Sequence, residues 1–268
     1  MPELPEVETV VRGLNAQVRG LTINRVLHAA AHLRRREPHL RDLAGDRFLD
    51  FHRRGKYIIA RLHSGRNLLI HLRMTGRVLF ETRTARRGKH DHLELEFVSA
   101  PEHLVFHDTR KFGVVEFLDE KRHDGYSSLG IEATEITGRQ LHELLRGRAR
   151  PIKALLLDQS AVAGVGNIYA DEALYRCRIH PLRPAGKLSR PQADALAIAI
   201  RRLMRLAIKK MGTTFDSYSG VNGNPGEFAR YLQVYNREGG RCRRCRGIIK
   251  KMRAAGRGTH YCPKCQKR

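Results

Sequence analysis

Two pairs of closely spaced cysteines near the end of the chain limit its fold more than any other feature. Cys242 and Cys245 are followed by Cys262 and Cys265, with the spacing C-x2-C-x16-C-x2-C. Each C-x-x-C turn can direct two thiolates at one ion, and two such turns complete a tetrahedral zinc site. Disulfides are the structural alternative, but a cytoplasmic chain keeps its thiols reduced. We therefore predict one structural Zn²⁺ on these four cysteines, with no open position for catalysis.

The 268-residue chain is strongly basic, with 51 Lys and Arg against 27 Asp and Glu and a net charge of +24. Such self-repulsion disfavours a compact chain unless a polyanion relieves it. Nucleic acid is the favoured partner, because neutralised phosphates release their counterions. An anionic membrane is favoured less, since no basic amphipathic helix stands out. No apolar run approaches the ~20 residues of a membrane span, so we expect a cytoplasmic protein that acts as a monomer.

The first half of the chain predicts strands packed with one helix. Val7, Val10, Val11 and Leu14 repeat at helical spacing after Pro5, and the pattern stops near Gly20. Residues 21–118 then alternate as strands, and two apolar runs around residues 64–66 predict a hairpin. We expect an antiparallel β-sandwich with a packed helix over residues 2–125.

The second half predicts helices. Thr137 is a candidate cap, helices are expected over IKALLLDQ and after GVGN, and Ser189 with Gln192 opens a long helix that ends near Gly212. A polar linker near residues 119–135 separates the two halves. The expected fold class is α+β, with a helical domain over 135–235 and a four-cysteine zinc finger with a β-hairpin over 236–268.

Several motifs together resemble the formamidopyrimidine-DNA glycosylase family. They are PELPEVETV at the N-terminus, HLRMTG at 71–76, DTRKFG at 108–113, GVGNIYADE at 164–172, GTT at 212–214 and GRGTHYCPKCQ at 256–266. The resemblance runs along the whole chain in the order of the family. It implies a bacterial, nucleoid-associated enzyme of base-excision repair that removes 8-oxoguanine and ring-opened purines from damaged double-stranded DNA and then cleaves the abasic strand. It also implies a helix–two-turn–helix motif in the helical domain.

The start of the chain acquires a chemical meaning from this resemblance. Removal of Met1 would make Pro2 a free secondary amine, which titrates near ~8, well below a lysine. Attack of this amine on the sugar C1′ would expel the base and leave an iminium, which permits β- and then δ-elimination. Glu3 would supply a proton as the sugar ring opens, and Glu6 is a weaker candidate for assistance. Acidic residues also favour a helix N-terminus without any catalysis.

The resemblance implies roles for further side chains. A flipped nucleotide leaves a hole in the duplex, which Met74, Arg110 and Phe112 would fill. Residues 213–228 resemble a lid over the flipped base. Phosphate or DNA contacts, in part catalytic, are implied for Lys56, His90, Arg110, Lys153, Asn167 and Arg257. Without the resemblance, most of these residues would be interpreted as core or solvated side chains.

Two other functions stay open at this point. A glycosylase of the endonuclease VIII type would share the architecture and act on oxidised pyrimidines. A non-catalytic zinc-finger DNA-binding protein would explain the charge and the cysteines, but not the pair Pro2–Glu3.

Overall fold

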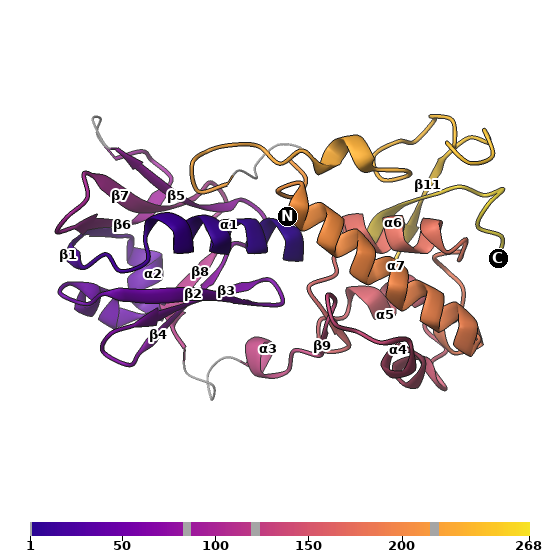
Figure 1. Ribbon diagram of the computed structural model, residues 1–268, viewed down its shortest axis with the longest axis horizontal. Helices are drawn as coiled ribbons and strands as arrows, with labels where there is room; N and C mark the ends of the chain where they lie inside the picture. Colours follow the sequence, from indigo (N-terminus) through magenta and orange to yellow (C-terminus); the bar gives the residue numbers. More distant parts are fainter. Residues whose placement is uncertain (1, 83–86, 119–123, 215–219) are drawn as a thin grey trace. The chain divides into compact units, whose positions relative to one another are not determined.

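A computed structural model describes residues 2–82, 87–118, 124–214 and 220–268 of the chain. The chain forms two compact units, shown in Figure 1. The first comprises residues 1–127 and 210–229, and the second comprises residues 128–209 and 230–268. The segment 210–229 therefore packs with the first unit, although the sequence places it within the range expected for the helical domain.

The first unit is built on two four-stranded antiparallel sheets. One has the strand order β1-β6-β7-β5 and the other β2-β3-β4-β8. The strands are β1 (Ile23–Ala29), β2 (Phe48–Arg54), β3 (Tyr57–Leu62), β4 (Asn67–His71), β5 (Gly76–Thr82), β6 (Asp91–Phe97), β7 (Glu102–Asp108) and β8 (Val114–Phe117). The predicted sandwich and its β3–β4 hairpin are confirmed.

Helix α1 (Leu4–Gln17) completes the core of this unit. Its apolar stripe lies in one cluster with side chains of both sheets, and Figure 1 shows the helix running alongside them. Asn15 ties α1 to β2, because its amide donates to Phe51 O at 2.7 Å and its oxygen accepts from Phe51 N at 3.0 Å. The N-terminal residues are therefore carried on a helix fixed along its length.

Short helices complete the first unit. They are α2 (Ala31–Arg36), the 3-10 helix η1 (Pro38–Leu43) and α3 (Asp124–Ser127). Alpha-helix α2 and η1 were not predicted from the sequence, because segments this short bury too few side chains to show a helical repeat.

The second unit is mainly helical, as predicted. Its elements are β9 (Ile131–Glu132), α4 (Gly138–Leu145), α5 (Ile152–Leu157), β10 (Val162–Ala163), α6 (Asn167–Arg176), η2 (Ala185–Lys187), α7 (Arg190–Lys209), β11 (Lys250–Ala254) and β12 (Arg257–Tyr261), and η3 (Phe228–Tyr231) spans the unit boundary. Thr137 and Gln140 form the capping box that opens α4. The long helix α7 packs against α4 and α6, so the apolar stripe seen in the sequence faces this core.

Strands β11 and β12 form an antiparallel hairpin at the cysteine-rich end. The turn residues Ala255 and Gly256 both have positive φ, 52° and 69°. This is the geometry of the two-residue turns that match the twist of paired strands. Among the described residues, no helix is both long and apolar enough to cross a membrane.

Candidate functional site

The N-terminus of the first unit is held by a carboxylate network. Pro2 and Glu3 are buried just before α1. The Glu6 carboxylate accepts a hydrogen bond from Glu3 N at 2.8 Å through its Oε2 atom. The backbone next to Pro2 is therefore fixed from within the first turn of the helix, where acidic side chains are also favoured by the helix dipole.

The second oxygen of Glu6 reaches the segment that returns from the far end of the chain. Its Oε1 atom accepts from Thr213 N at 2.7 Å. Gly212 has φ +75°, and a Cβ on it would lie 2.8 Å from Glu6 Oε1. Only glycine allows this approach, which gives the GTT motif a physical reason. Glu6 thus joins the helix start to the base of the predicted lid.

The predicted lid, residues 213–228, is described over residues 213–214 and 220–228, and residues 215–219 lie outside the described parts. Val221 is buried in the core of the first unit, where it contacts Gly13 of α1 so closely that a Cβ there would lie 2.9 Å from it. Its carbonyl accepts from Phe80 N at 3.1 Å. Both described ends are therefore anchored, one on Glu6 and the other on α1 and β5.

Lys56 lies in the tight turn between β2 and β3 and is largely buried. Arg53, on β2, donates to Glu8 of α1 at 3.0 Å and to Gly55 O at 3.1 Å. These bonds connect the turn to the N-terminal half of α1. Lys56 is therefore held on the side of the sandwich where α1 begins.

His71 is a neighbour of this turn that the sequence analysis did not single out. It pairs with Tyr57 across β3 and β4, and its Nδ1 accepts from Arg73 N at 2.9 Å. Burial first, and then the charges of Arg73 and Lys56, lower the pKa of His71 to about 3. The ring is therefore neutral at physiological pH and presents Nε2–H as a donor.

Two loops bring together the predicted void-filling residues. Met74 follows β4, whereas Arg110 and Phe112 lie between β7 and β8. Arg110 donates to Met74 Sδ at 3.2 Å, and its guanidinium lies 4.7 Å from the centre of the Phe112 ring. Phe112 is 50% exposed, which is unusual for a large apolar side chain. The three side chains form one group in which Arg110 and Phe112 are exposed and Met74 is half-buried, although Met74 lies far from the other two in the sequence.

Asp108 holds these loops in place. It is fully buried, and its carboxylate accepts from Thr75 Oγ1, from Arg110 N at 3.1 Å and from Gly113 N at 2.7 Å. Burial favours a higher pKa for Asp108, but these hydrogen bonds outweigh it and hold the pKa below the usual range. An ionised, fully engaged carboxylate thus fixes the geometry of both loops.

His90 lies close to the same loops. Its carbonyl accepts from Asp108 N at 2.9 Å, and its ring packs edge-on against His107 at 5.8 Å. His90 Nδ1 is buried and has no hydrogen-bond partner within the described ranges. The structure therefore places His90 next to Asp108, the residue that holds the loops of the void-filling group.

In the second unit, the four predicted cysteines converge. Their Sγ atoms all lie within 4.8 Å of one another, with 3.9 Å between Cys242 and Cys265 and 3.4 Å between Cys245 and Cys262. A tetrahedron of Zn–S bonds of about 2.3 Å has edges of about 3.8 Å. These separations are too long for disulfides, and all four cysteines are free thiols. The residues present fit one structural zinc ion.

A buried ion pair fixes β12 against the helices. Lys153 Nζ of α5 lies 2.6 Å from Asp171 Oδ1 of α6, and both side chains are 0% exposed. Lys153 also donates to Thr259 Oγ1 at 2.7 Å, and His260 N donates to Asp171 Oδ2 at 2.8 Å. The lysine predicted to contact DNA is thus placed beneath the hairpin.

Asn167 and Arg257 are both connected to the start of β12. Asn167 opens α6, and its side-chain amide donates to Gly258 O at 3.0 Å. Arg257 begins β12 directly after the turn and is exposed. The structure therefore brings together Lys153, Asn167 and Arg257 in the second unit, each connected to β12, with only Arg257 fully open to solvent.

Asp171 and Glu172, within the motif GVGNIYADE, are supports that the sequence analysis quoted without assigning a role. Glu172 is buried, and its Oε1 accepts from the backbone N–H groups of residues 233, 234 and 235 at 2.8, 2.8 and 3.1 Å. The signal available in the sequence was a pair of adjacent acidic residues between Ala170 and Ala173 in a short helical segment. Their partners are distant in sequence, so only the fold identifies them.

Comparisons with known proteins cover the whole chain. Residues 1–115 match the formamidopyrimidine-DNA glycosylase N-terminal domain, residues 129–219 the formamidopyrimidine-DNA glycosylase H2TH domain, and residues 239–268 a zinc finger found in FPG and IleRS. A formamidopyrimidine-DNA glycosylase of Roseiflexus sp. is 42% identical over 277 residues, covering 100% of both chains. One of Ruegeria sp. is 38% identical over 286 residues, again covering 100% of both.

Solved structures give the same result. A complex between Lactococcus lactis Fpg and DNA containing an abasic site has a TM-score of 0.92 and 36% identity, covering 99% of this chain and 100% of that one. A mutant of the same protein in complex with DNA containing Fapy-dG has a TM-score of 0.91 and 36% identity, with 100% of both chains covered. The chain belongs to the formamidopyrimidine-DNA glycosylase family.

Proposed function

We propose that this chain excises oxidised purines, such as 8-oxoguanine and formamidopyrimidines, from double-stranded DNA and then nicks the abasic strand. The observation that carries the proposal is the arrangement at the N-terminus. Pro2 and Glu3 are buried together at the start of α1. The Glu6 carboxylate accepts hydrogen bonds from the backbone of Glu3 and of Thr213, and so joins this start to the 210–229 segment. Family membership along the full chain and the net charge of +24 support a DNA substrate.

Pro2 is proposed as the nucleophile, after removal of Met1. Its lone pair forms a bond to the sugar C1′, the glycosidic bond breaks, and the base leaves with its bonding electrons and a proton. Opening of the sugar ring gives an iminium between the Pro2 nitrogen and C1′. This cation acidifies the C2′ protons, so that loss of one proton expels the 3′ phosphate and a second elimination expels the 5′ phosphate.

Glu3 is proposed as the proton donor to the ring oxygen O4′. Its position next to Pro2 in the chain places a carboxyl group close to the attacked carbon. Glu6 is proposed as a positioning residue, because its two oxygens hold the backbone N–H groups of Glu3 and Thr213. Lys56 is proposed to bind a phosphate next to the reacting sugar, with the neutral ring of His71 as a second donor.

In the second unit, Arg257 and Asn167 are proposed as phosphate contacts. The four cysteines would hold a zinc ion that supplies no step of the reaction and only ties the hairpin together. Lys153 is buried in an ion pair, so we propose that it supports the hairpin instead of touching DNA. Met74, Arg110 and Phe112 are proposed to occupy the space left by the flipped nucleotide, with His90 as a nearby phosphate contact.

The proposed domains follow the sequence boundaries: a catalytic sandwich over 2–125, a helical DNA-binding domain over 135–235 and the zinc finger over 236–268. Association with the bacterial nucleoid follows from the proposed activity, since the substrate is chromosomal DNA. The 210–229 segment belongs to the range proposed for the helical domain, but it packs with the first unit. It would therefore carry a loop of the helical domain to the catalytic sandwich.

Borohydride trapping tests the catalytic proposal. Reduction of the iminium converts the C=N bond into a stable amine, so the chain should become covalently attached to duplex DNA that contains 8-oxoguanine. A variant with one residue added before Pro2 should show no attachment. Efficient trapping by that extended variant, or strand cleavage without any trapped species, would contradict Pro2 as the nucleophile.

The choice of lesion is tested separately. Excision of 8-oxoguanine opposite cytosine should exceed excision of thymine glycol by at least tenfold in kcat/KM. The reverse preference would leave the Pro2 chemistry intact and assign the chain the substrate range of an endonuclease VIII. Binding without excision of either base would favour a non-catalytic DNA-binding protein.

A further inference from the structure

A basic cavity in the first unit has no role in the proposed reaction. It has a volume of about 460 Å³ and lies where the end of β1, helix α2, the start of β6 and the β7–β8 loop meet. Its lining includes His28, His32, Arg35, Arg87, His92 and Lys111. None of these side chains belongs to the group around Pro2 or to the void-filling group.

Three cations in the lining of this cavity form no ion pair among the residues that the structure describes. Within the described parts of the chain, Arg35, Arg87 and Lys111 have no ion-pair partner. Asp91 is the acidic residue in the lining. Its carboxylate is already engaged, because it accepts from Gly88 N at 2.7 Å and lies 2.8 Å from His107 Nδ1. The cavity therefore gathers cations whose counter-charge is not supplied by its own walls.

Two histidines at the centre of the cavity give a second, independent observation. His92 is 3% exposed, and its Nε2–H donates to Asp108 O at 2.7 Å. Its ring packs edge-on against His32 at 4.7 Å. His32 Nε2 is buried and lacks a hydrogen-bond partner within the described ranges. A buried polar atom without a partner calls for a ligand or an ordered water.

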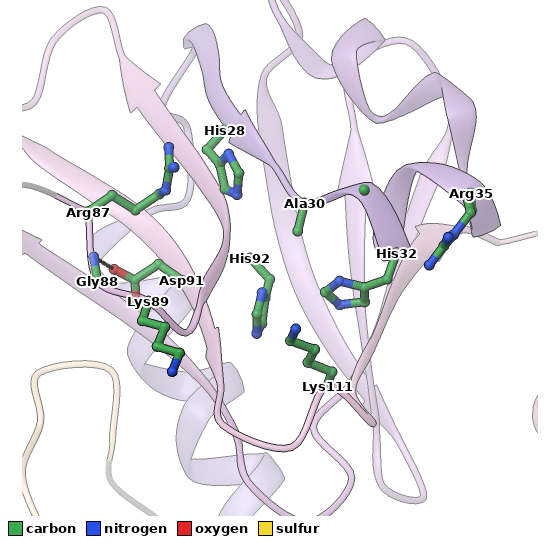
Figure 2. Close-up of a pocket in the computed structure, with 11 residues that line it drawn as sticks. His28, Ala30, His32, Arg35, Arg87, Gly88, Lys89, Asp91, His92 and Lys111 are labelled. Carbon is green, nitrogen blue, oxygen red and sulfur yellow. Dashed lines mark hydrogen bonds between the residues drawn. The ribbon is translucent and has the colours of Figure 1, made fainter.

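Burial and nearby charges both act on the two histidines. Desolvation first, and then the charges of His92 and Lys111, lower the pKa of His32, although Asp108 acts in the opposite direction. Desolvation and Arg87 likewise lower the pKa of His28, although Glu94 acts in the opposite direction. Figure 2 shows the Lys111 amine directed toward the rings of His32 and His92, with Arg35 at one end of the cavity and His28 and Arg87 at the other.

We propose that this cavity binds a phosphate monoester or pyrophosphate group. A doubly charged phosphate matches several cations that line one cavity better than a single carboxylate does, and guanidinium groups bind phosphate oxygens in pairs. The volume of about 460 Å³ falls in the range of small-molecule sites, so the group attached to the phosphate can also enter. A phosphorylated DNA end and a free nucleotide share this chemistry. The proposal does not depend on the catalytic role of Pro2.

Histidine ring resonances measure binding directly in the full chain. Inorganic phosphate and pyrophosphate are titrated at constant ionic strength, with chloride as the balancing anion. We expect saturable shifts of His32 and His92, and a rise of at least half a pH unit in the titration midpoint of His32 at saturation. Shifts that do not saturate, or that chloride reproduces, would overturn the proposal.

Matched double variants separate the cavity from the general charge of the surface. Arg35→Gln with Arg87→Gln should weaken pyrophosphate binding at least tenfold. Arg19→Gln with Arg41→Gln removes the same charge from exposed positions of the same unit. This pair should change the affinity for pyrophosphate less than twofold. Equal weakening by both pairs would show that only the overall field attracts the anion, and the site would be rejected.

The source of the phosphate is decided by two further probes. A nicked duplex with a 5′ phosphate is compared with the same duplex carrying a 5′ hydroxyl, and adenosine monophosphate is titrated alone. A shift of His32 that requires the 5′ phosphate identifies a DNA end, whereas saturation by the nucleotide identifies a free ligand. Either outcome supports the cavity as a phosphate site. The absence of both shifts, together with no response to pyrophosphate, would refute it.

Discussion

The N-terminal helix start and the zinc hairpin are both held rigidly, but by different physical means. Around Pro2 and Glu3, the backbone rests on a helix whose apolar face is buried in the core of the two sheets. The hairpin has only a small cluster beneath it, made of Tyr175, Val234, Ile249 and two cysteines, with two more cysteines packed against it. It therefore depends on a buried ion pair and on the metal its thiolates can hold.

The difference teaches how a small element can present a charged side chain accurately. A sandwich of eight strands supplies enough burial to fix a helix end by packing. The hydrogen bonds of Glu6 then position only the backbone of Glu3 and Thr213. A hairpin of two five-residue strands cannot do so, so cross-links replace the missing core. This contrast makes testable predictions for both regions.

Removing the metal should disable the hairpin and spare the sandwich. Chelation or Cys262→Ser should lower the affinity for lesion-containing DNA at least about 100-fold, because structural zinc contributes about 10–16 kcal/mol to the folding of zinc-finger peptides. Metal analysis measures the zinc content, and fluorescence anisotropy measures the affinity for DNA. Cys177→Ser is the matched control, since Cys177 lies outside the four-cysteine group. Unchanged DNA affinity in a zinc-free variant would contradict the claim that the hairpin depends on the metal.

Glu3→Gln should reduce chemistry while leaving the sandwich stable. Loss of a positioned general acid lowers a rate by about 10²–10⁴-fold, and we expect this for base release from 8-oxoguanine DNA in single-turnover experiments. If Glu3 served only as a helix cap, the variant would retain most of its rate, because the glutamine oxygen can still accept the hydrogen bond of the cap. Urea unfolding on the same sample checks that a loss of rate is not a loss of the folded state.

Breaking the buried ion pair tests the hairpin's second support. Lys153→Met should lower the unfolding free energy by about 3–5 kcal/mol, because Asp171 is left charged and buried. The double variant Lys153→Met with Asp171→Asn should recover part of this loss, since neither charge remains. Arg139→Met is the control, because the Arg139–Glu143 pair is 78% and 57% exposed and should contribute at most about 0.5 kcal/mol.

The same variants also show whether Lys153 supports the hairpin or contacts DNA itself. If Lys153 only holds β12, the double variant should bind DNA nearly as well as the parent chain once its stability recovers. A loss of DNA affinity that persists in the stable double variant would show instead that the lysine itself reaches the DNA.

His71→Gln should change how the unfolding free energy of the sandwich depends on pH. The pKa of His71 is lowered from 6.5 to about 3 in the folded chain, so the unfolded chain binds more protons between these values. Folded stability therefore falls as the pH drops below 6.5, by up to about 1.4 kcal/mol per pH unit. The variant should gain about 2 kcal/mol relative to the parent chain between pH 7 and pH 5. Urea unfolding at both pH values measures this, and no relative gain would contradict the buried neutral ring.

His63→Gln is the reference for this experiment. His63 lies in the β3–β4 turn of the same sheet and is exposed, so its replacement controls for the loss of an imidazole from the surface of this sheet.

Phe112→Ala should have the smallest effect on stability and a selective effect on function. The ring is 50% exposed, so the unfolding free energy should change by less than about 0.5 kcal/mol. Excision of 8-oxoguanine should fall about tenfold or more, because the wedge that assists nucleotide flipping is lost, while cleavage of a preformed abasic site should stay within threefold. Equal losses on both substrates would contradict the wedge.

Much of the fold was accessible from local patterns. The α1 stripe, the β3–β4 hairpin, the Thr137 capping box and the cysteine spacing each depend on residues within a few turns of one another. Such signals survive in a single sequence because the physical cause is local. The helix α2 and the pair β9–β10 were missed, since elements of six and two residues carry too little periodicity.

The candidate site was accessible only in part. The resemblance pointed to Pro2, Glu3 and the void-filling residues, and the structure brings Met74, Arg110 and Phe112 together. The supports of the site were not visible. Asp108, Asp171 and Glu172 resemble ordinary acidic residues in the sequence, and each acts on backbone groups that only the fold brings near.

By itself, the sequence determined the family of the chain and the four thiols placed to hold one zinc ion, because the order of the motifs and the cysteine spacing are sufficient for these two conclusions. Only the tertiary structure decided that Lys153 lies beneath the hairpin, that Glu6 joins α1 to Gly212–Thr213, and that a basic cavity surrounds His32 and His92. The reason is that burial and ion pairing depend on contacts between residues as many as 207 positions apart, and no local pattern encodes such contacts.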